Sequence, residues 1–336
     1  MTLTVKLECQ EDCFDDPAWG RLLDHDPNRH IFASPQWHRL WWGEFKAGKE
    51  LLVLTMRRAG GVAAFVPLYR KQEDGRDILR FVGGIDLTDY LGPICSLDDR
   101  DDVADALTGW LGTTETSWDE LDAHNMPVPL GFAEFLVESA DRRGFGFLLE
   151  QEETSAIVVL PDSWDTYLEG LDSKERHELK RKRRRLGRDY PDAIFRTATE
   201  ESLDADLKTF FEMHKEAEGH KGRFMGEAMQ SFFRRIADEF MPRGWLKLDL
   251  LEIGDRAVAA TFGFEVDDTF YLYNSAYEPS AARLSPGLVL VSELVKSSIA
   301  KGLKTVDLLR GPERYKYQLG AQAVPLNNVR VLHRAD

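Results

Sequence analysis

Apolar and polar residues recur in the same order in the two halves of the chain. In the second half, residues 245–253 and 257–265 have the pattern of two strands joined at Gly254-Asp255, which predicts a β-hairpin. A third strand, a helix that ends at Gly302 and a fourth strand are expected next, at residues 269–276, 286–301 and 305–309.

The first half repeats this order. Residues 51–56 and 62–67 form a second hairpin pattern around Ala59-Gly60-Gly61. A strand, a helix and a strand with an acidic residue follow it, at residues 78–83, 101–111 and 118–122. Each hairpin comes after an aromatic-rich helix, at residues 35–45 and 227–240. Such repetition indicates two copies of one fold in tandem. We expect an α/β (α+β) protein of two domains, each a mixed, mostly antiparallel sheet flanked by helices.

The boundary between the copies is expected near residues 150–155, which gives domains of residues 1–152 and 153–336. No stretch rich in Pro, Gly or Ser separates the copies, so we expect a packed junction and not a flexible tether. A cleft between two such halves is the default place for a bound substrate.

The turn before the helix at residues 286–301 has the properties of an anion site. Ser285 suits the N-cap, Pro286 suits the first helical position, and Gly287 lets a ligand approach the backbone closely. The N–H groups of the first turn, at Gly287 and Leu288, would face an anion such as a pyrophosphate. A plain helix cap is the alternative interpretation.

The matching loop of the first half, residues 86–102, carries six aspartates, which would repel a phosphate. We therefore expect the second domain to bind the anionic ligand. The first domain is expected to be a degenerate copy that shapes the other side of the site.

Composition narrows the class of protein. The chain has 336 residues, a hydrophobic content of 43% and a mean hydropathy of −0.37, as in globular proteins with room for two domains. No apolar run approaches the roughly 18 to 20 residues that span a bilayer, and the start lacks a signal-peptide pattern, so we expect a cytoplasmic protein without membrane contact. The three cysteines show no metal-ligand spacing, and we expect no metal.

Four motifs together resemble one family. They are Tyr271-Leu272-Tyr273-Asn274-Ser275-Ala276-Tyr277, Leu284-Ser285-Pro286-Gly287-Leu288, Asp307-Leu308-Leu309-Arg310-Gly311 and Glu313-Arg314-Tyr315-Lys316. With residues 175–186 and 214–224, they are similar to the CelD-like or BioF2-like (Acetyltransf_6) acetyltransferases of the GNAT superfamily. The resemblance covers residues 155–325. The tandem arrangement resembles the Fem-type aminoacyl-tRNA-dependent peptidyltransferases.

The resemblance implies an N-acyltransferase that uses acyl-CoA, such as acetyl-CoA, as co-substrate. The acceptor would be an amine, a small molecule or a peptide, in the cleft between the domains. The usual pyrophosphate loop has the form Arg/Gln-x-x-Gly-x-Gly/Ala, and residues 283–288 keep only part of it. Two alternatives stay open: an aminoacyl-tRNA donor, and a catalytically silent component of polysaccharide biosynthesis. Because two fused domains already supply a cleft, we expect a monomer.

Acyl transfer to an amine requires donors for the oxyanion and a proton for the leaving group. Asp307 is the candidate acceptor of the amine proton, Tyr315 the candidate proton donor, and Lys316 the candidate for neutralising developing negative charge. A structural ion pair between Asp307 and Arg310, and a core position for Tyr315, are the alternatives.

The remaining candidates are binding residues. The backbone of the strand with Tyr273, Asn274 and Ser275 would contact the acyl arm of the cofactor, beside the turn with Ser285, Gly287 and Leu288. Contacts to the acceptor would come from Arg310, Glu313, His220 and Arg223, the last two in a glycine-rich basic segment that is equally readable as a surface turn.

A basic segment stands out in a chain of net charge −15, a charge that argues against general nucleic-acid binding. From Lys174 to Arg188, nine of fifteen residues are Lys or Arg. A solvated helix face explains such a segment. The alternatives are a cradle for the tRNA acceptor stem, as Fem-type enzymes would require, and contact with the 3′-phosphate of CoA.

Overall fold

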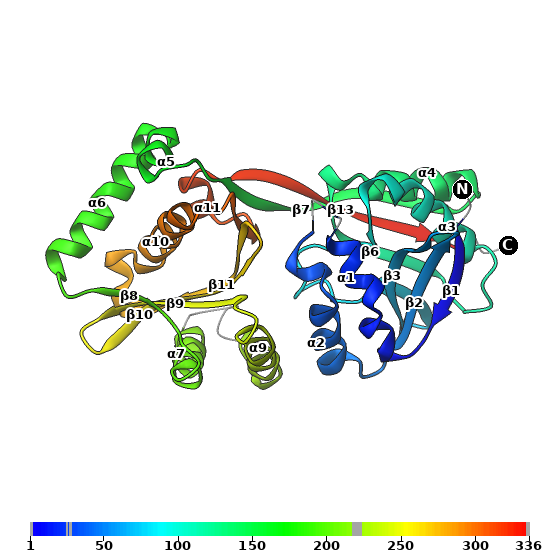
Figure 1. Ribbon diagram of the computed structural model, residues 1–336, viewed down its shortest axis with the longest axis horizontal. Coiled ribbons are helices and arrows are strands. Elements are labelled where there is room, and N and C mark those ends of the chain that lie inside the picture. The colour runs from blue at the N-terminus through cyan, green and yellow to red at the C-terminus, as the bar shows by residue number, and fades with distance from the viewer. Residues whose placement is uncertain (1–2, 25, 27–28, 217–223, 334–336) are drawn as a thin grey trace. The chain divides into compact units, whose positions relative to one another are not determined.

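The computed structural model describes residues 3–24, 26, 29–216 and 224–333 and divides the chain into two compact units (Figure 1). Unit 1 consists of Met1–Thr154 with Val324–Asp336, and unit 2 consists of Ser155–Ala323. The boundary at Thr154 lies close to the predicted one. The C-terminal segment differs from our expectation, because β13 (Gln322–Leu332) pairs with β6 (Glu120–Pro127) and thus belongs mostly to unit 1.

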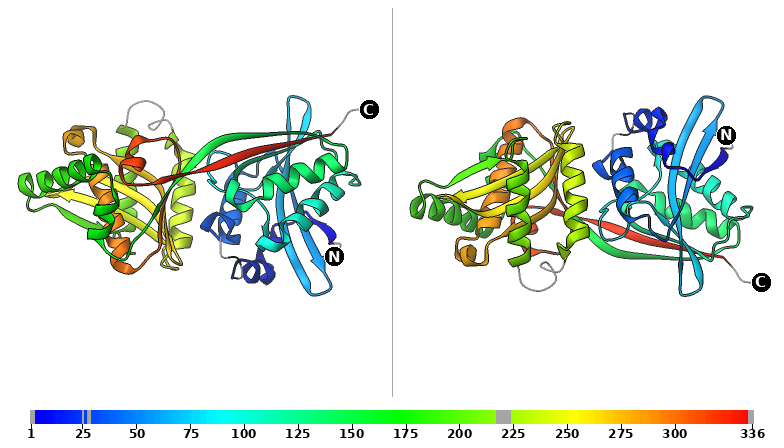
Figure 2. Two further views of the ribbon diagram at one scale, coloured as in Figure 1. Left: turned by 90° about the horizontal axis from the view of Figure 1, so that it is seen from above. Right: turned by 90° about the horizontal axis from the view of Figure 1, so that it is seen from below.

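Unit 1 contains a mixed sheet in the order β1-β2-β3-β4-β6-β13-β7, with β5 paired to β3. The pairs β1–β2, β2–β3, β3–β4 and β6–β13 are antiparallel, and β4 runs parallel to β6. In both views of Figure 2, β13 runs beside β7. The other strands of this sheet are β1 (Thr4–Glu8), β2 (Glu50–Arg58), β3 (Gly61–Glu73), β4 (Arg76–Phe81), β5 (Ile94–Cys95) and the first part of β7 (Gly146–Val159).

Helices cover both faces of this sheet. The α helices are α1 (Pro17–Asp24), α2 (Pro35–Phe45), α3 (Arg100–Leu111) and α4 (Phe132–Arg142), and short 3-10 turns lie at Glu11–Asp15, Ile31–Ala33, Leu97–Asp99 and Val128–Leu130. On one face, Leu107 and Leu136 of α3 and α4 join Leu79 in a fully buried cluster. On the other, Trp19 of α1 stacks on Phe65 with ring centroids 4.7 Å apart.

Unit 2 contains a second mixed sheet in the order β7-β12-β11-β10-β9-β8. β11 and β12 are parallel, whereas the pairs β7–β12, β10–β11, β9–β10 and β8–β9 are antiparallel. Besides the second part of β7, the strands are β8 (Ile194–Thr197), β9 (Leu246–Ile253), β10 (Arg256–Val266), β11 (Thr269–Tyr277) and β12 (Thr305–Arg310).

The helices of unit 2 also lie on two faces of the sheet (Figure 1). They are α5 (Trp164–Gly170), α6 (Ser173–Asp189), α7 (Leu203–Glu216), α9 (Glu227–Phe240), α10 (Pro286–Lys301) and α11 (Arg314–Gln318), with a 3-10 turn at Pro279–Leu284. Val295 of α10 is buried with Val306 of β12, and Phe233 of α9 packs on Phe262 of β10 at 4.9 Å. As predicted, α10 ends at Gly302, which has φ +80°.

The predicted internal repeat is confirmed. In unit 1 the hairpin β2–β3 leads through β4 and α3 to β6, and in unit 2 the hairpin β9–β10 leads through β11 and α10 to β12. In each unit the strand before the long helix is parallel to the strand after it. An aromatic-rich helix precedes each hairpin, α2 in unit 1 and α9 in unit 2.

Candidate functional site

The parallel strands β11 and β12 pair only along part of their length. The pairing covers Thr269–Tyr271 against Thr305–Asp307, and the rest of β11 extends beyond it. Leu309 of β12 has φ +58°, a strained value for a leucine. Asp307 Oδ1 accepts a hydrogen bond of 2.9 Å from the backbone N–H of Leu309, inside the same irregular stretch of β12. The Asp307 side chain therefore supports the bend of β12 away from β11.

The N-terminus of α10 follows β11 in the chain order and has an unusual first turn. Ser285 precedes the helix with φ +52° and ψ +50°, and its hydroxyl makes no capping hydrogen bond, so the predicted side-chain cap is absent. Val289 donates to the Ser285 carbonyl at 3.1 Å, and Pro286 has no N–H. By helix geometry the N–H groups of Gly287 and Leu288 point out of the helix end, available for a ligand.

A pocket of about 300 Å³ opens at this helix end. Six of the predicted site residues line it: Ser275, Ser285, Gly287, Leu288, Glu313 and Tyr315. They come from β11, the start of α10 and the start of α11, three elements that are far apart in the sequence. Tyr277, which is half exposed, and Val291 also line the pocket and were not among the predicted site residues.

Tyr315 provides a phenol at the wall of the pocket. Burial raises the pKa of Tyr315 above its ordinary value, and the neighbouring Glu313 carboxylate acts in the same direction. The Ser275 side chain, which lines the same pocket, acts in the opposite direction and lowers this pKa. The phenol is therefore protonated at neutral pH and can donate its proton to a group bound in the pocket.

Lys316 is buried, with 3% of its surface exposed, and its ammonium group has three partners. Nζ donates to the carbonyl oxygens of Leu309 at 3.1 Å and Arg310 at 2.5 Å, and it pairs with the Glu313 carboxylate at 3.0 Å. Because an ammonium has three hydrogens, these partners satisfy it. These contacts tie β12 to α11, and the direct role in neutralising charge that the sequence suggested for Lys316 stays a prediction.

The other predicted residues lie outside the pocket lining. Tyr273 packs among aromatic rings of α9 and β10, with Phe264 at 5.3 Å and Phe233 at 5.5 Å. The Asn274 side chain accepts from the backbone N–H of Ser275 at 2.7 Å. Arg310 is half-buried and offers its carbonyl to Lys316. His220 and Arg223 lie outside the described residues.

In unit 1 the counterpart of this site is much smaller, with a cavity of about 30 Å³ lined by Leu91, Arg100 and Met126. β4 and β6 pair through Leu79 and Leu121, and Asn125 of β6, with φ +54°, then holds the loop that follows β4. Its Nδ2 donates to the carbonyls of Ile85 at 2.9 Å and Thr88 at 2.8 Å. The start of α3 is occupied as well, since Arg58 pairs with Asp99 at 2.7 Å and Asp102 at 3.1 Å.

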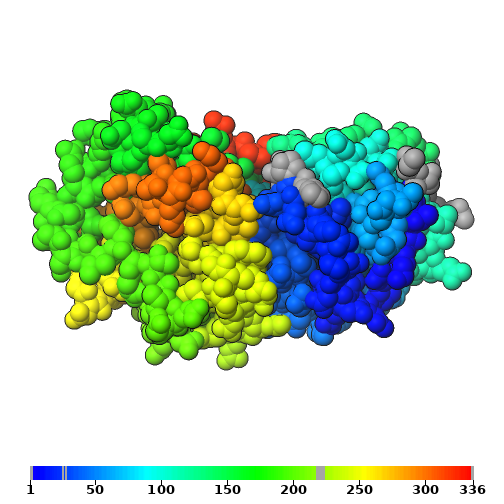
Figure 3. Space-filling model, viewed as in Figure 1, coloured from blue at the N-terminus to red at the C-terminus, as the bar shows by residue number. Residues whose placement is uncertain are grey.

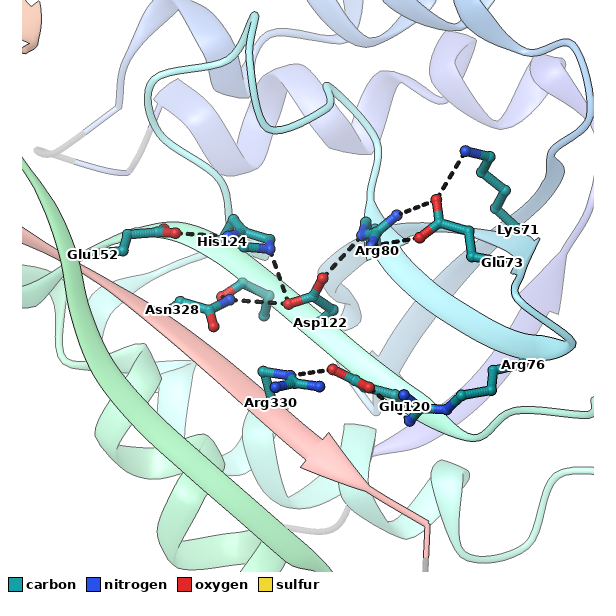
Figure 4. A network of polar contacts seen from close by, with 11 residues as sticks. Lys71, Glu73, Arg76, Arg80, Glu120, Asp122, His124, Glu152, Asn328 and Arg330 are labelled. Carbon is teal, nitrogen blue, oxygen red and sulfur yellow. Dashed lines mark hydrogen bonds and ion pairs between the residues drawn. The ribbon is translucent and has the colours of Figure 1, made fainter.

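A polar network on β3, β4, β6, β7 and β13 of unit 1 was not anticipated (Figure 4). His124 lies between two carboxylates, with Nε2 2.9 Å from Asp122 and Nδ1 2.6 Å from Glu152. Their hydrogen bonds and charges outweigh the effect of burial and raise the pKa of His124 to about 9. Arg80 joins Asp122 at 3.0 Å to Glu73 at 2.8 Å. Every charge drawn has a partner of opposite sign, so the network links strands and offers no open binding group.

The basic segment of residues 174–188 forms most of α6, which is open to solvent in Figure 3. Part of its charge is structural: Arg183 pairs with Glu293, donates to Ser292 Oγ at 2.8 Å and lies 5.3 Å from the Trp164 ring. Lys174 and Lys182, with Arg314 of α11, line a shallow groove of about 640 Å³. The helix therefore combines a packed face with an exposed basic one.

Residues 3–24, 26, 29–216 and 224–333 contain no cluster of His, Cys, Asp or Glu suited to holding a metal ion. Within the same ranges, no helix is both long and apolar enough to cross a bilayer.

Comparison with known proteins finds one family model that matches part of the chain. Residues 173–317 match the family model of the acetyltransferase (GNAT) domain. The matched range includes β11, α10, β12 and most of α11. It therefore contains the pocket residues Ser275, Ser285, Gly287, Glu313 and Tyr315. No curated protein sequence matches the chain.

Solved structures share the fold of the whole chain. A crystal structure of FemX is 13% identical over 97% of both chains, with a TM-score of 0.64. The C-terminal DUF2156 domain of a lysylphosphatidylglycerol synthetase from Agrobacterium fabrum is 12% identical over 96% of this chain and 92% of that chain, with a TM-score of 0.56. A tandem GNAT protein from the clavulanic acid biosynthesis pathway is 12% identical over 99% of this chain and 100% of that chain, with a TM-score of 0.50. The fold is therefore two GNAT-like domains in tandem, as predicted.

Proposed function

We propose, from the premise that residues 173–317 form an acetyltransferase (GNAT) domain, that the chain transfers an acyl group from acyl-CoA to an amine. One observation carries the proposal: the pocket at the N-terminus of α10 combines outward N–H groups with the phenol of Tyr315. The first feature suits the phosphates of a CoA thioester, and the second suits its leaving group.

The reaction follows from this arrangement. A neutral amine attacks the thioester carbonyl carbon, and the resulting ammonium proton passes to water. The carbon–sulfur bond then breaks, and the Tyr315 phenol gives its proton to the departing sulfur. Because burial raises the pKa of Tyr315, the phenol keeps this proton until the thiolate forms. The products are an amide and free CoA, and the Tyr315 proton is regained from solvent.

We assign supporting roles to Lys316 and Asp307. Lys316 holds the carbonyls of Leu309 and Arg310 and the Glu313 carboxylate, so it fixes the turn that presents Tyr315. Asp307 holds the N–H of Leu309 and thereby the bend of β12. In this proposal both residues position the pocket. The sequence had instead suggested charge neutralisation for Lys316 and acceptance of the amine proton for Asp307.

Thermal unfolding with millimolar acetyl-CoA tests the donor. A ligand at about 100 times its Kd adds roughly 2.7 kcal/mol of stability, a clear rise in Tm. We expect Ser285→Glu to abolish the rise, because it places a negative charge at the helix N-terminus. Gln151→Glu, which adds the same charge at an exposed position of β7, should leave it intact. If acetyl-CoA still raises the Tm of Ser285→Glu, acetyl-CoA does not bind in this pocket.

A second candidate is transfer from aminoacyl-tRNA, which the exposed basic face of α6 favours. Lys174 and Arg314 line the groove beside α6, where they could bind phosphates of a nucleic acid. Charge reversal of both should then weaken tRNA binding and lower its salt dependence, whereas Lys208→Glu on α7 should not. If neither acetyl-CoA nor tRNA binds, a catalytically silent component of polysaccharide biosynthesis becomes the better explanation.

A further inference from the structure

A second hollow of unit 2 lies between the C-terminal half of α10 and the strands β8 and β9. Its volume is about 200 Å³. Ser297 and Lys301 of α10 form one side, and Thr197, Lys247 and Asp249 of the strands form the other. Gly287 of the first pocket and Ser297 are ten residues apart on α10, about 15 Å at 1.5 Å per residue, so the two hollows are separate.

The hollow contains a carboxylate without a cationic partner among the described residues. Asp249 Oδ1 accepts a hydrogen bond of 2.5 Å from the Thr197 hydroxyl, and the charges of Lys301 and Lys247 act on it without a direct ion pair. Burial raises the pKa of Asp249, as expected for such a group. An acid in this setting gains most from a ligand that brings a positive charge.

Two lysines at the same hollow provide the opposite charge. Lys247 Nζ donates to the Gly244 carbonyl at 3.0 Å, and Lys301 Nζ pairs with Glu265 at 2.6 Å. Each ammonium has three hydrogens, so both retain donors after these contacts. A simple cation would be repelled by the lysines and a simple anion by Asp249, whereas a molecule with both charges would satisfy the two sides.

We propose that this hollow binds a small zwitterion of amino-acid size, with its ammonium group at Asp249 and its carboxylate at Lys247 and Lys301. The volume corresponds to roughly seven water molecules at about 30 Å³ each, which suits a small amino acid. Leu290, Leu294 and Phe270 line the hollow as well and provide an apolar surface for a side chain. This inference does not depend on the proposed acyl transfer.

Isothermal titration of the full chain tests the proposal. The probes are L-alanine, L-serine and L-leucine, with ethylamine and acetate as single-charge controls. We expect at least one amino acid to bind at least ten times more tightly than ethylamine or acetate. The proposal is overturned if none of the amino acids binds, or if acetate or ethylamine binds equally well.

Variants locate the binding. Asp249→Asn retains an oxygen for Thr197 and removes a charge that has no direct ion pair, so it should fold and should weaken amino-acid binding at least tenfold. Lys301→Gln should weaken it as well. Asp255→Asn in the exposed β9–β10 turn, and Ser285→Glu at the first pocket, should not. Unchanged affinity in Asp249→Asn would exclude this site even if an amino acid binds elsewhere, and a failure of acetyl-CoA binding would leave the test unaffected.

Discussion

The Ser275 side chain of β11 lies beside the phenol of Tyr315 in α11, across 40 residues of sequence, and lowers its pKa against the effect of burial. This proximity relates the strand that extends past the parallel pairing to the helix that follows β12. Both residues line the pocket at the start of α10. The hydroxyl of Ser275 therefore sets the position of the group to which we assign proton donation.

Ser275→Ala should lower kcat for acyl transfer while leaving KM for acetyl-CoA nearly unchanged, because the phenol remains but loses its orientation. Tyr315→Phe should lower kcat by about 10²-fold or more, as loss of a general acid does. Ser275→Thr keeps the hydroxyl and should recover much of the rate. Steady-state kinetics of the three variants checks this, and equal loss in Ser275→Thr and Ser275→Ala would contradict the positioning role.

Lys316→Met should lower the free energy of unfolding by about 1–3 kcal/mol, because it leaves two carbonyls and a carboxylate near the buried end of β12 without their donor. Urea denaturation measures the change. The exposed Lys208→Met on α7 is the matched control and should stay within about 0.5 kcal/mol of the wild type. A Lys316→Met protein of normal stability that has lost only its activity would return Lys316 to a direct catalytic role.

The free energy of unfolding should fall as the pH rises through about 9, because His124 loses its proton there. Its pKa is raised in the folded chain from the ordinary 6.5 to about 9, so the charged imidazole between Asp122 and Glu152 stabilises the fold fully below pH 6.5 and loses this contribution as pH passes 9. Urea denaturation between pH 6 and 10 follows the effect. His124→Gln should flatten the curve in this window, whereas His177→Gln on the exposed α6 should not. If the free energy of unfolding of His124→Gln depends on pH as steeply as that of the wild type, groups other than His124 cause the pH dependence.

Acetyl-CoA should bind with one molecule per chain. In unit 1 the loop after β4 is held by Asn125 through the carbonyls of Ile85 and Thr88, and acidic residues surround the start of α3. Isothermal titration gives the stoichiometry. Asn125→Ala should lower the free energy of unfolding without changing this stoichiometry. A stoichiometry of two would contradict the prediction, because unit 1 would then bind acetyl-CoA as well.

Much of the fold could be predicted from the sequence because its signals are local. Alternation of apolar residues and the turn at Gly254-Asp255 indicated β9 and β10, and Gly302 indicated the end of α10. The repeat followed from comparing the two halves. The two motifs around Ser285 and Tyr315 identified residues that line one pocket. Each motif lies at the start of a helix, α10 or α11, whose position is a fixed part of this fold.

The amino-acid sequence by itself thus determined the order of elements, the internal repeat and the segments that form the pocket. Only the tertiary structure decided what individual polar groups do. Lys316 is a clamp because the bend at Leu309 and the turn at Gly311, with φ +121°, bring two carbonyls and Glu313 to its ammonium group. β13 completes unit 1 because it pairs with β6, about 200 residues earlier in the chain. Such contacts depend on the path of the whole backbone, which periodicity and local motifs do not encode.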